Sequence, residues 1–216
     1  MKHPILLTLP IIALAALLTL PALADKKEKS GGFTVLYDGT SLDQLQTTGN
    51  WQIQEDGSLY LEPREGEEGW KRYDAYLWLP GEYENFECDF EYKFEEGGNS
   101  GFYFRIADEA EPTQSGFEVQ ILDSYGKEAA THHDNGGVIK TSPPLVNASI
   151  PAGEWNHMNV VLRGSKLKVM LNGKKVQEID IDELRPEGKA LAASGKIAIQ
   201  DHGQKFWVRN LKIKRL

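Results

Sequence analysis

The stretch Phe86-Glu-Cys-Asp-Phe-Glu-Tyr-Lys-Phe94 decides the fold class. Its apolar side chains occupy every second position, so they fall on one face of an extended strand while the charged side chains fall on the other. Such a strand covers a core with one face and meets water with the other, as in antiparallel sheets. Cys88 lies in the apolar row, so we expect it to be a core residue rather than a nucleophile.

The sequence on both sides of this stretch contains turn signals at intervals of roughly ten residues, which is typical of short strands joined by tight turns. No segment after the N-terminal region shows sustained helical periodicity. We therefore expect an all-β, jelly-roll β-sandwich of two antiparallel sheets. The clearest turn signals are Asp38-Gly39, Asp56-Gly57, Gly97-Gly98-Asn99, Gly136-Gly137, Asn172-Gly173 and His202-Gly203.

The first residues have the pattern of a secretory signal. Lys2 and His3 precede the apolar run from Ile5 to Leu20, and Ala22-Leu23-Ala24 provides a small-x-small cleavage site. The apolar run is shorter than the roughly 20 residues of a membrane-spanning helix. We expect a signal peptide over 1–24, a linker over 25–32 and one domain over 33–216, exported to the periplasm or beyond and without a membrane span after cleavage. A retained N-terminal anchor is the alternative.

The charge balance and the cysteine count limit the class of protein. The chain has 24 basic and 32 acidic residues and a net charge of −8. An acidic domain without a basic stripe argues against nucleic acid as a partner. With one cysteine, the chain forms no internal disulfide, so its core has to supply the stability.

Two segments place polar side chains on a common strand face. If residues 101–106 pair with residues 117–121, Tyr103 and Arg105 share a face with Glu118 and Gln120, while Phe102, Phe104 and Ile106 point inward. Polar groups flanked by aromatic rings suit a hydroxylated ligand such as a sugar. An ordinary solvated sheet face is the alternative.

Three further groups are candidates for chemistry. Asp123 follows Glu118 and Gln120 with a spacing like that of a two-carboxylate glycosidase strand, but its parity is wrong unless a bulge intervenes. His132-His133-Asp134 is either a metal-binding loop or a polar rim, since metal chelation usually needs three or four ligands. His202, beside Asp201 at a predicted strand end, is either a general base or a structural hydrogen-bonding residue.

Several blocks of sequence occur in a fixed order along the chain. They include Phe33-Thr-Val-Leu-Tyr-Asp-Gly39, Gly98-Asn-Ser-Gly-Phe-Tyr-Phe-Arg105, Phe117-Glu-Val-Gln-Ile-Leu-Asp123, Gly153-Glu-Trp-Asn156, Gly195-Lys-Ile-Ala-Ile-Gln-Asp-His-Gly203 and Phe206-Trp-Val-Arg-Asn-Leu-Lys-Ile213. Together they resemble the 3-keto-disaccharide hydrolase domain family over nearly the whole chain after the expected signal. The resemblance implies a concanavalin A-like sandwich with a concave ligand face, export by bacteria and activity on glycosides oxidised at sugar carbon 3.

The implied reaction needs a base, a group that stabilises an enolate oxygen and an acid for the leaving group. A ketone at carbon 3 acidifies the carbon 2 proton; its removal gives an enolate, the aglycone leaves carbon 1, and water adds back. The resemblance makes His202 or Glu118 the base, with Arg105 holding the enolate oxygen or orienting Glu118. Lys140 supplies another positive group, and a divalent metal is an alternative stabiliser. The implied substrate-binding residues are Tyr103, Gln120, Asp123, Lys140 and Gln200.

Two other functions fit the same sequence. One is a non-catalytic carbohydrate-binding module of the same fold, and the other is a structural exported sandwich that binds a protein. A base is not needed for binding alone, so the combination of Arg105, Glu118 and His202 favours the enzyme. A protein-binding role would require an exposed apolar patch.

Overall fold

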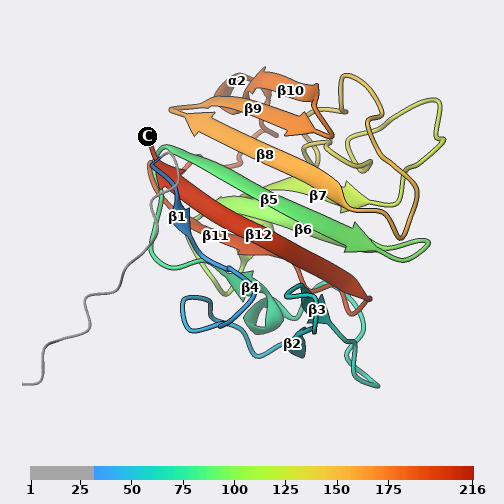
Figure 1. The fold of residues 1–216 in the computed structure, drawn as a ribbon. Helices are drawn as coiled ribbons and strands as arrows, with labels where there is room; N and C mark the ends of the chain where they lie inside the picture. The colour runs from blue at the N-terminus through green and yellow to red at the C-terminus, as the bar shows by residue number, and fades with distance from the viewer. Residues whose placement is uncertain (1–31) are drawn as a thin grey trace, which may run out of the picture.

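The computed structural model describes residues 32–216, and over this range the chain is a sandwich of two antiparallel sheets (Figure 1). The all-β, two-sheet fold class predicted from the sequence is thereby confirmed. The expected signal peptide and all but the last residue of the expected linker lie outside the described residues. Three short helices interrupt the loops: η1 (Tyr73–Ala75), α1 (Pro112–Ser115) and α2 (Ile181–Leu184).

The larger sheet has eight strands in the order β10-β9-β8-β5-β12-β3-β2, with β1 beside β12. The smaller sheet has four strands in the order β4-β11-β6-β7. In the larger sheet the strands are β1 (Thr34–Val35), β2 (Trp51–Ile53), β3 (Leu59–Leu61), β5 (Phe86–Phe94), β8 (Asn156–Arg163), β9 (Lys166–Leu171), β10 (Lys174–Asp180) and β12 (Phe206–Arg215). In the smaller sheet they are β4 (Leu77–Trp78), β6 (Asn99–Ile106), β7 (Phe117–Leu122) and β11 (Lys196–Ile199).

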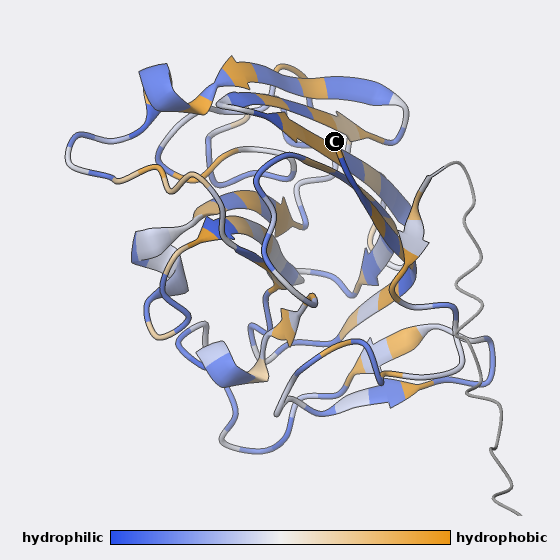
Figure 2. Cartoon of the chain, turned by 90° about the vertical axis from the view of Figure 1, so that its left-hand side faces the viewer, coloured by the Kyte–Doolittle hydropathy of each residue, from blue (hydrophilic) through white to orange (hydrophobic). Residues whose placement is uncertain are grey.

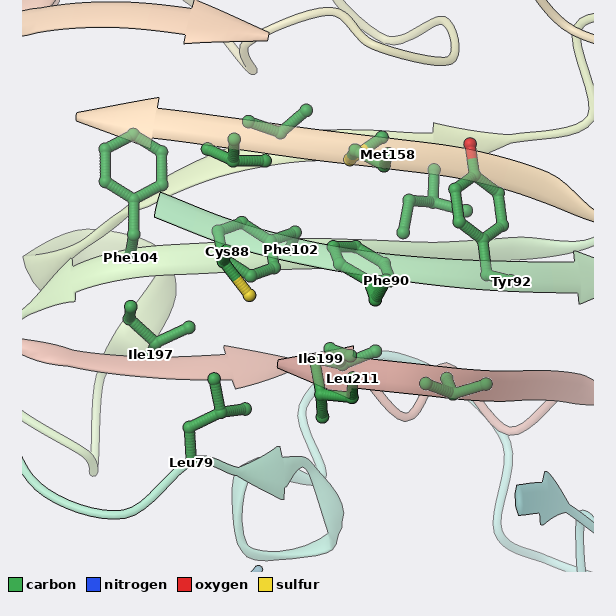
Figure 3. Packing of buried hydrophobic residues seen from close by; sticks show 14 of the residues in the cluster. Leu79, Cys88, Phe90, Tyr92, Phe102, Phe104, Met158, Ile197, Ile199 and Leu211 are labelled. Atoms are coloured by element: carbon green, nitrogen blue, oxygen red, sulfur yellow. The ribbon is translucent and has the colours of Figure 1, made fainter. Parts of the chain in front are cut away.

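The core lies between the two sheets and is centred on β5. Buried and partly exposed residues alternate along this strand without exception, and Figure 2 shows the same alternation of polar and apolar residues along the strands. Phe90 of β5 stacks on Phe102 of β6, with ring centroids 5.5 Å apart, which ties the two sheets together (Figure 3). Cys88 is fully buried in this core, where burial raises the pKa of its thiol, as expected for an unreactive cysteine.

A bulge in β6 changes which side chains face outward. Along β11, Ala198 pairs with Tyr103 and Lys196 with Ile106, so two residues of β11 span three of β6. Arg105 sits in this bulge with a φ of 55°. Ile106 therefore joins Tyr103, Tyr76, Trp78 and Ala198 in an outer cluster. The expectation that Ile106 points inward, and that Arg105 shares an outer face with Tyr103, is wrong.

Candidate functional site

A cleft of about 910 Å³ lies over the outer face of the smaller sheet. β6, β7 and the end of β11 form its floor. Its walls are α1 and two loops, one around residue 139 and one around residue 188. The polar and aromatic side chains that line it include Trp70, Asn99, Tyr103, Glu118, Gln120, His133, Lys140, Lys189, Gln200 and His202.

The pairing of β6 with β7 places the predicted polar residues side by side. Tyr103 lies opposite Glu118, and Gly101 lies opposite Gln120, so the expected strand pairing is confirmed. Gly101 also has a steric role, because a Cβ at this position would lie 2.2 Å from Glu118 Oε1. The absence of a side chain at Gly101 lets the Glu118 carboxylate lie across β6.

A chain of hydrogen bonds runs beneath the cleft to the Glu118 carboxylate. Tyr103 Oη donates to Glu118 Oε2 at 2.6 Å, and Gln200 Nε2 donates to Tyr103 Oη at 3.3 Å. Gln200 Nε2 also donates to Tyr76 Oη at 3.0 Å, and Tyr76 Oη donates to the carbonyl oxygen of Trp70 at 2.8 Å. The Glu118 carboxylate is thereby bonded by Tyr103 of β6, which in turn is linked to the residue after β11 and to the segment before β4.

The electrostatics of Glu118 suit proton transfer near neutral pH. Burial raises the pKa of Glu118 to about 7, against the opposing effects of the Tyr103 hydrogen bond and the positive charge of Lys189. Burial and the Glu118 charge raise the pKa of Tyr103, so its hydroxyl stays protonated and donates. A carboxyl group with a pKa near the working pH both accepts and returns a proton readily.

His202 lines the same cleft from the turn after β11. Its Nε2 lies 3.3 Å from Asn99 Nδ2, and burial lowers the pKa of the imidazole. A neutral imidazole at neutral pH follows. The neighbouring Asp201 is buried and pairs elsewhere, with Arg72 at 3.0 Å and the backbone N–H of Gly203 at 2.7 Å.

Arg105 and Asp123 lie outside the cleft. The guanidinium of Arg105 is buried and donates to the carbonyl oxygens of Glu84, Gly164 and Ala192, where it joins three loops. Asp123 Oδ2 accepts a hydrogen bond from the backbone N–H of Gly97 at 3.0 Å, and it lines a separate hollow of about 500 Å³. The structure therefore does not bring either side chain together with Glu118.

Lys140 and Gln120 do line the cleft. Residues 136–139 run beside β7 as an additional edge, with the N–H of Ile139 donating to the carbonyl oxygen of Glu118 at 3.0 Å, and this edge delivers the exposed Lys140 to the rim. Gln120 is buried, and its Oε1 accepts a hydrogen bond from the backbone N–H of Ile121 at 3.1 Å.

Among the cleft residues that sequence reasoning missed are Lys189 and Asn99. Lys189 Nζ lies 5.1 Å from the centroid of the Phe117 ring and donates to the carbonyl oxygen of Gln114 at 2.9 Å. Burial and the neighbouring Lys140 lower the pKa of this ammonium. Lys189 lies in a loop without periodicity or motif. Asn99 falls inside the block Gly98–Arg105, where its place at the start of a strand was the available signal.

The arrangement of donors in the described part of the chain does not fit a metal centre. Among residues 32–216, no three His, Cys, Asp or Glu side chains gather as a metal ion requires. In the loop that holds His132, His133 and Asp134, the carboxylate instead accepts hydrogen bonds from Lys127 at 2.7 Å and from the backbone N–H of Thr131 at 2.6 Å. We therefore derive no catalytic step through a metal.

No helix within residues 32–216 is long and apolar enough to cross a membrane.

Comparisons with known proteins place this chain among carbohydrate-related proteins. A 3-keto-disaccharide hydrolase from Bacteroides thetaiotaomicron is 23% identical, with 86% of this chain and 79% of that protein covered. A crystal structure from Parabacteroides distasonis, of a protein provisionally named a glycosyl hydrolase, is 26% identical with a TM-score of 0.71, and the match covers 85% of this chain and 99% of that one.

The fold is shared more widely. A carbohydrate-binding module, CBM66 from Bacillus subtilis, has a TM-score of 0.52 at 13% identity over 85% of this chain and 95% of its own. The model of the 3-keto-alpha-glucoside-1,2-lyase-like domain matches residues 32–214. The family match, the Bacteroides relative and the Parabacteroides structure support a glycoside hydrolase-like function. The chain belongs to the 3-keto-alpha-glucoside-1,2-lyase-like domain family.

Proposed function

We propose that this protein cleaves glycosides whose sugar is oxidised to a ketone at carbon 3, by elimination followed by hydration. The observation that carries the proposal is the carboxyl group of Glu118, held by Tyr103 on the floor of the cleft and poised to exchange a proton near pH 7. The name of the related family and that of the Bacteroides relative support this substrate class.

In the first step, Glu118 acts as the base. The ketone makes the carbon 2 proton acidic, and Glu118 takes that proton while the C–H electrons move toward the carbon 3 oxygen as an enolate. Tyr103 holds Oε2 by its hydrogen bond, which leaves Oε1 for the proton. The positive charge of Lys189 acts on the same region, and this ammonium takes the enolate-stabilising role that the sequence suggested for Arg105.

In the second step, the enolate electrons return and the bond between carbon 1 and the aglycone oxygen breaks. Glu118, now protonated, returns its proton to the departing oxygen. Water then adds across the new double bond, with its oxygen on carbon 1 and a proton on carbon 2. His202, as a neutral imidazole in the same cleft, takes one proton from the attacking water and releases it to carbon 2, so that the addition balances.

Ordinary glycoside hydrolysis is less well supported. It requires a second carboxyl group acting across the glycosidic bond. Asp123, the residue that most resembled this second group in the sequence, lies in a separate hollow, where it accepts a hydrogen bond from the backbone N–H of Gly97. Asp108, Glu111 and Glu187 also line the cleft, but all three lie at exposed positions outside the sheet that carries Glu118. The apolar run from Ile5 to Leu20 supports the further proposal that the reaction takes place outside the cytoplasm.

A non-catalytic carbohydrate-binding module is the second candidate. It is favoured by Trp70, which is 39% exposed at the rim of the cleft, where its ring can stack on a sugar. This role would not need a carboxyl group with a raised pKa.

The origin of the carbon 2 hydrogen in the product tests the proposed mechanism. A methyl 3-keto-glucoside is incubated with the protein in D₂O, and the released 3-keto sugar is analysed at early times by NMR. Elimination and hydration place solvent deuterium at carbon 2 of the product. The control is the free 3-keto sugar incubated under the same conditions, and the deuterium content at carbon 2 of the product should exceed that of the control. Cleavage that leaves carbon 2 at the level of that control would contradict the mechanism and indicate direct hydrolysis.

A further inference from the structure

The amide of Gln200 has an oxygen with no hydrogen-bond partner. Gln200 is 3% exposed and lines the cleft. Its nitrogen donates to the two tyrosine hydroxyls, Tyr76 and Tyr103. Its Oε1 is buried and has no partner within residues 32–216. Buried polar atoms are nearly always paired, so an acceptor left over beside a cleft indicates a ligand that donates.

The hydrogen-bond network fixes the orientation of this amide. A carbonyl oxygen only accepts, so at 2.8 Å the single hydroxyl proton of Tyr76 has to point at the Trp70 oxygen. Toward Gln200, Tyr76 can then only accept, and at 3.0 Å it requires the nitrogen of the amide. The reversed amide would place two lone pairs against each other. The carbonyl group of Trp70 therefore fixes the orientation of the Gln200 amide through Tyr76, and the Gln200 oxygen remains free to accept a hydrogen bond.

We propose that Gln200 is a specificity-determining residue whose Oε1 accepts a hydrogen bond from a hydroxyl group of the sugar. This inference rests on the proposed function, because it assumes that the cleft takes a sugar. A ketone carries no proton to donate, so the oxidised carbon 3 does not occupy this position. Gln200 thus binds a hydroxyl group on another carbon of the sugar, and this directs the ketone toward the side of the cleft where Lys189 lies.

Tyr76 has a separate part in this arrangement as a positioning residue. It does not line the cleft, but its bond to Trp70 disfavours the reversed amide, as the bond of Tyr103 to Glu118 also does. Replacing Tyr76 with Phe removes the first of these two restrictions without removing any group that meets the ligand. The selection of a donor at Gln200 should then weaken, although the cleft itself is unchanged.

The test is a binding titration with methyl α-glucoside and its 2-, 4- and 6-deoxy analogues. These sugars are not oxidised at carbon 3, so binding is measured without turnover, by calorimetry or Trp fluorescence. For the wild type, we expect one analogue to bind about tenfold more weakly than the parent. In Gln200→Met, the parent should bind as weakly as that analogue, and the discrimination between the two should vanish. Tyr76→Phe should reduce the discrimination.

Two outcomes would overturn the inference, and they are distinguishable. If Gln200→Met, with a wild-type melting profile, keeps the full discrimination among the analogues, Gln200 does not read a hydroxyl, while the proposed reaction stands. If the wild type binds none of these sugars and cleaves no 3-keto-glycoside, both the proposed function and the inference fall. Equal binding of all analogues by the wild type would also contradict the inference.

Discussion

Glu118, the proposed base, lowers the stability of the folded protein at neutral pH. Its carboxyl group ionises with a pKa near 4.5 when exposed, and burial in the folded protein raises that value to about 7. Between these two values the folded protein binds more protons than the unfolded chain. The free energy of unfolding therefore falls as the pH rises from about 4.5 to about 7, and the full penalty applies above that range.

Replacing this carboxyl group should separate the two effects. We expect Glu118→Gln to lower the rate on a 3-keto-glycoside by about 10²-fold or more, since an amide cannot take a proton. The variant should also be more stable than the wild type at pH 8, by on the order of 1–2 kcal/mol, and this gain should shrink toward pH 5. Urea unfolding at both pH values measures it. An identical pH dependence in the two proteins would contradict the burial of a charge at Glu118.

At the residue scale, sequence reasoning succeeded where side-chain parity was enough. Alternation along the strands correctly placed Cys88 in the core and Tyr103 beside Glu118. Alternation also argued against Asp123, whose parity is wrong, whereas the resemblance implied that Asp123 binds substrate. The second expectation is wrong: the carboxylate lies outside the cleft and accepts a hydrogen bond from the backbone N–H of Gly97.

At the scale of the element, the bulge in β6 determines which residues reach the cleft. One extra residue in a strand reverses the direction of every side chain after it. The sequence Phe102-Tyr-Phe-Arg-Ile106 keeps its alternation through the bulge, so the pattern contains no trace of the reversal. The left-handed φ of 55° at Arg105 is where the reversal occurs, and it moves Arg105 from the predicted site to a structural position.

We predict that Arg105 contributes more to the stability of the fold than to the catalytic rate. Arg105→Lys should lower the free energy of unfolding by about 2–3 kcal/mol, because an ammonium cannot reproduce the planar donors that meet the carbonyl oxygens of Glu84, Gly164 and Ala192. The kcat of the folded variant should stay within about threefold of the wild type. Chemical denaturation and steady-state kinetics check the two parts.

The matched control is Arg64→Lys. Arg64 pairs with Glu67 at 3.1 Å on the surface, where its side chain is 50% exposed, so the same change should cost under about 0.5 kcal/mol. If Arg105→Lys were as stable as Arg64→Lys but lost activity by about 10²-fold, Arg105 would act in the reaction and its assignment here as a structural residue would be wrong.

At the scale of the whole molecule, the sandwich was predictable because its strands alternate and its turns are marked. The apolar residues at every second position of Phe86–Phe94 are the residues of β5 that are fully buried. The walls of the cleft were not predictable in the same way. They come from α1 and from the segment 186–190, which have no periodicity, and their position depends on packing such as the contact of Lys189 with Phe117.

The central claim is that the cleft over β6 and β7 cleaves glycosides only after oxidation of the sugar at carbon 3. The direct measurement is release of a chromogenic aglycone from a 3-keto-glucoside and, in parallel, from the same glucoside without the ketone, with Glu118→Gln as the control for both. The account predicts release from the keto form alone, with loss of about 10²-fold or more in the variant. Equal release from the unoxidised glucoside, or full activity of Glu118→Gln on the keto form, would contradict it.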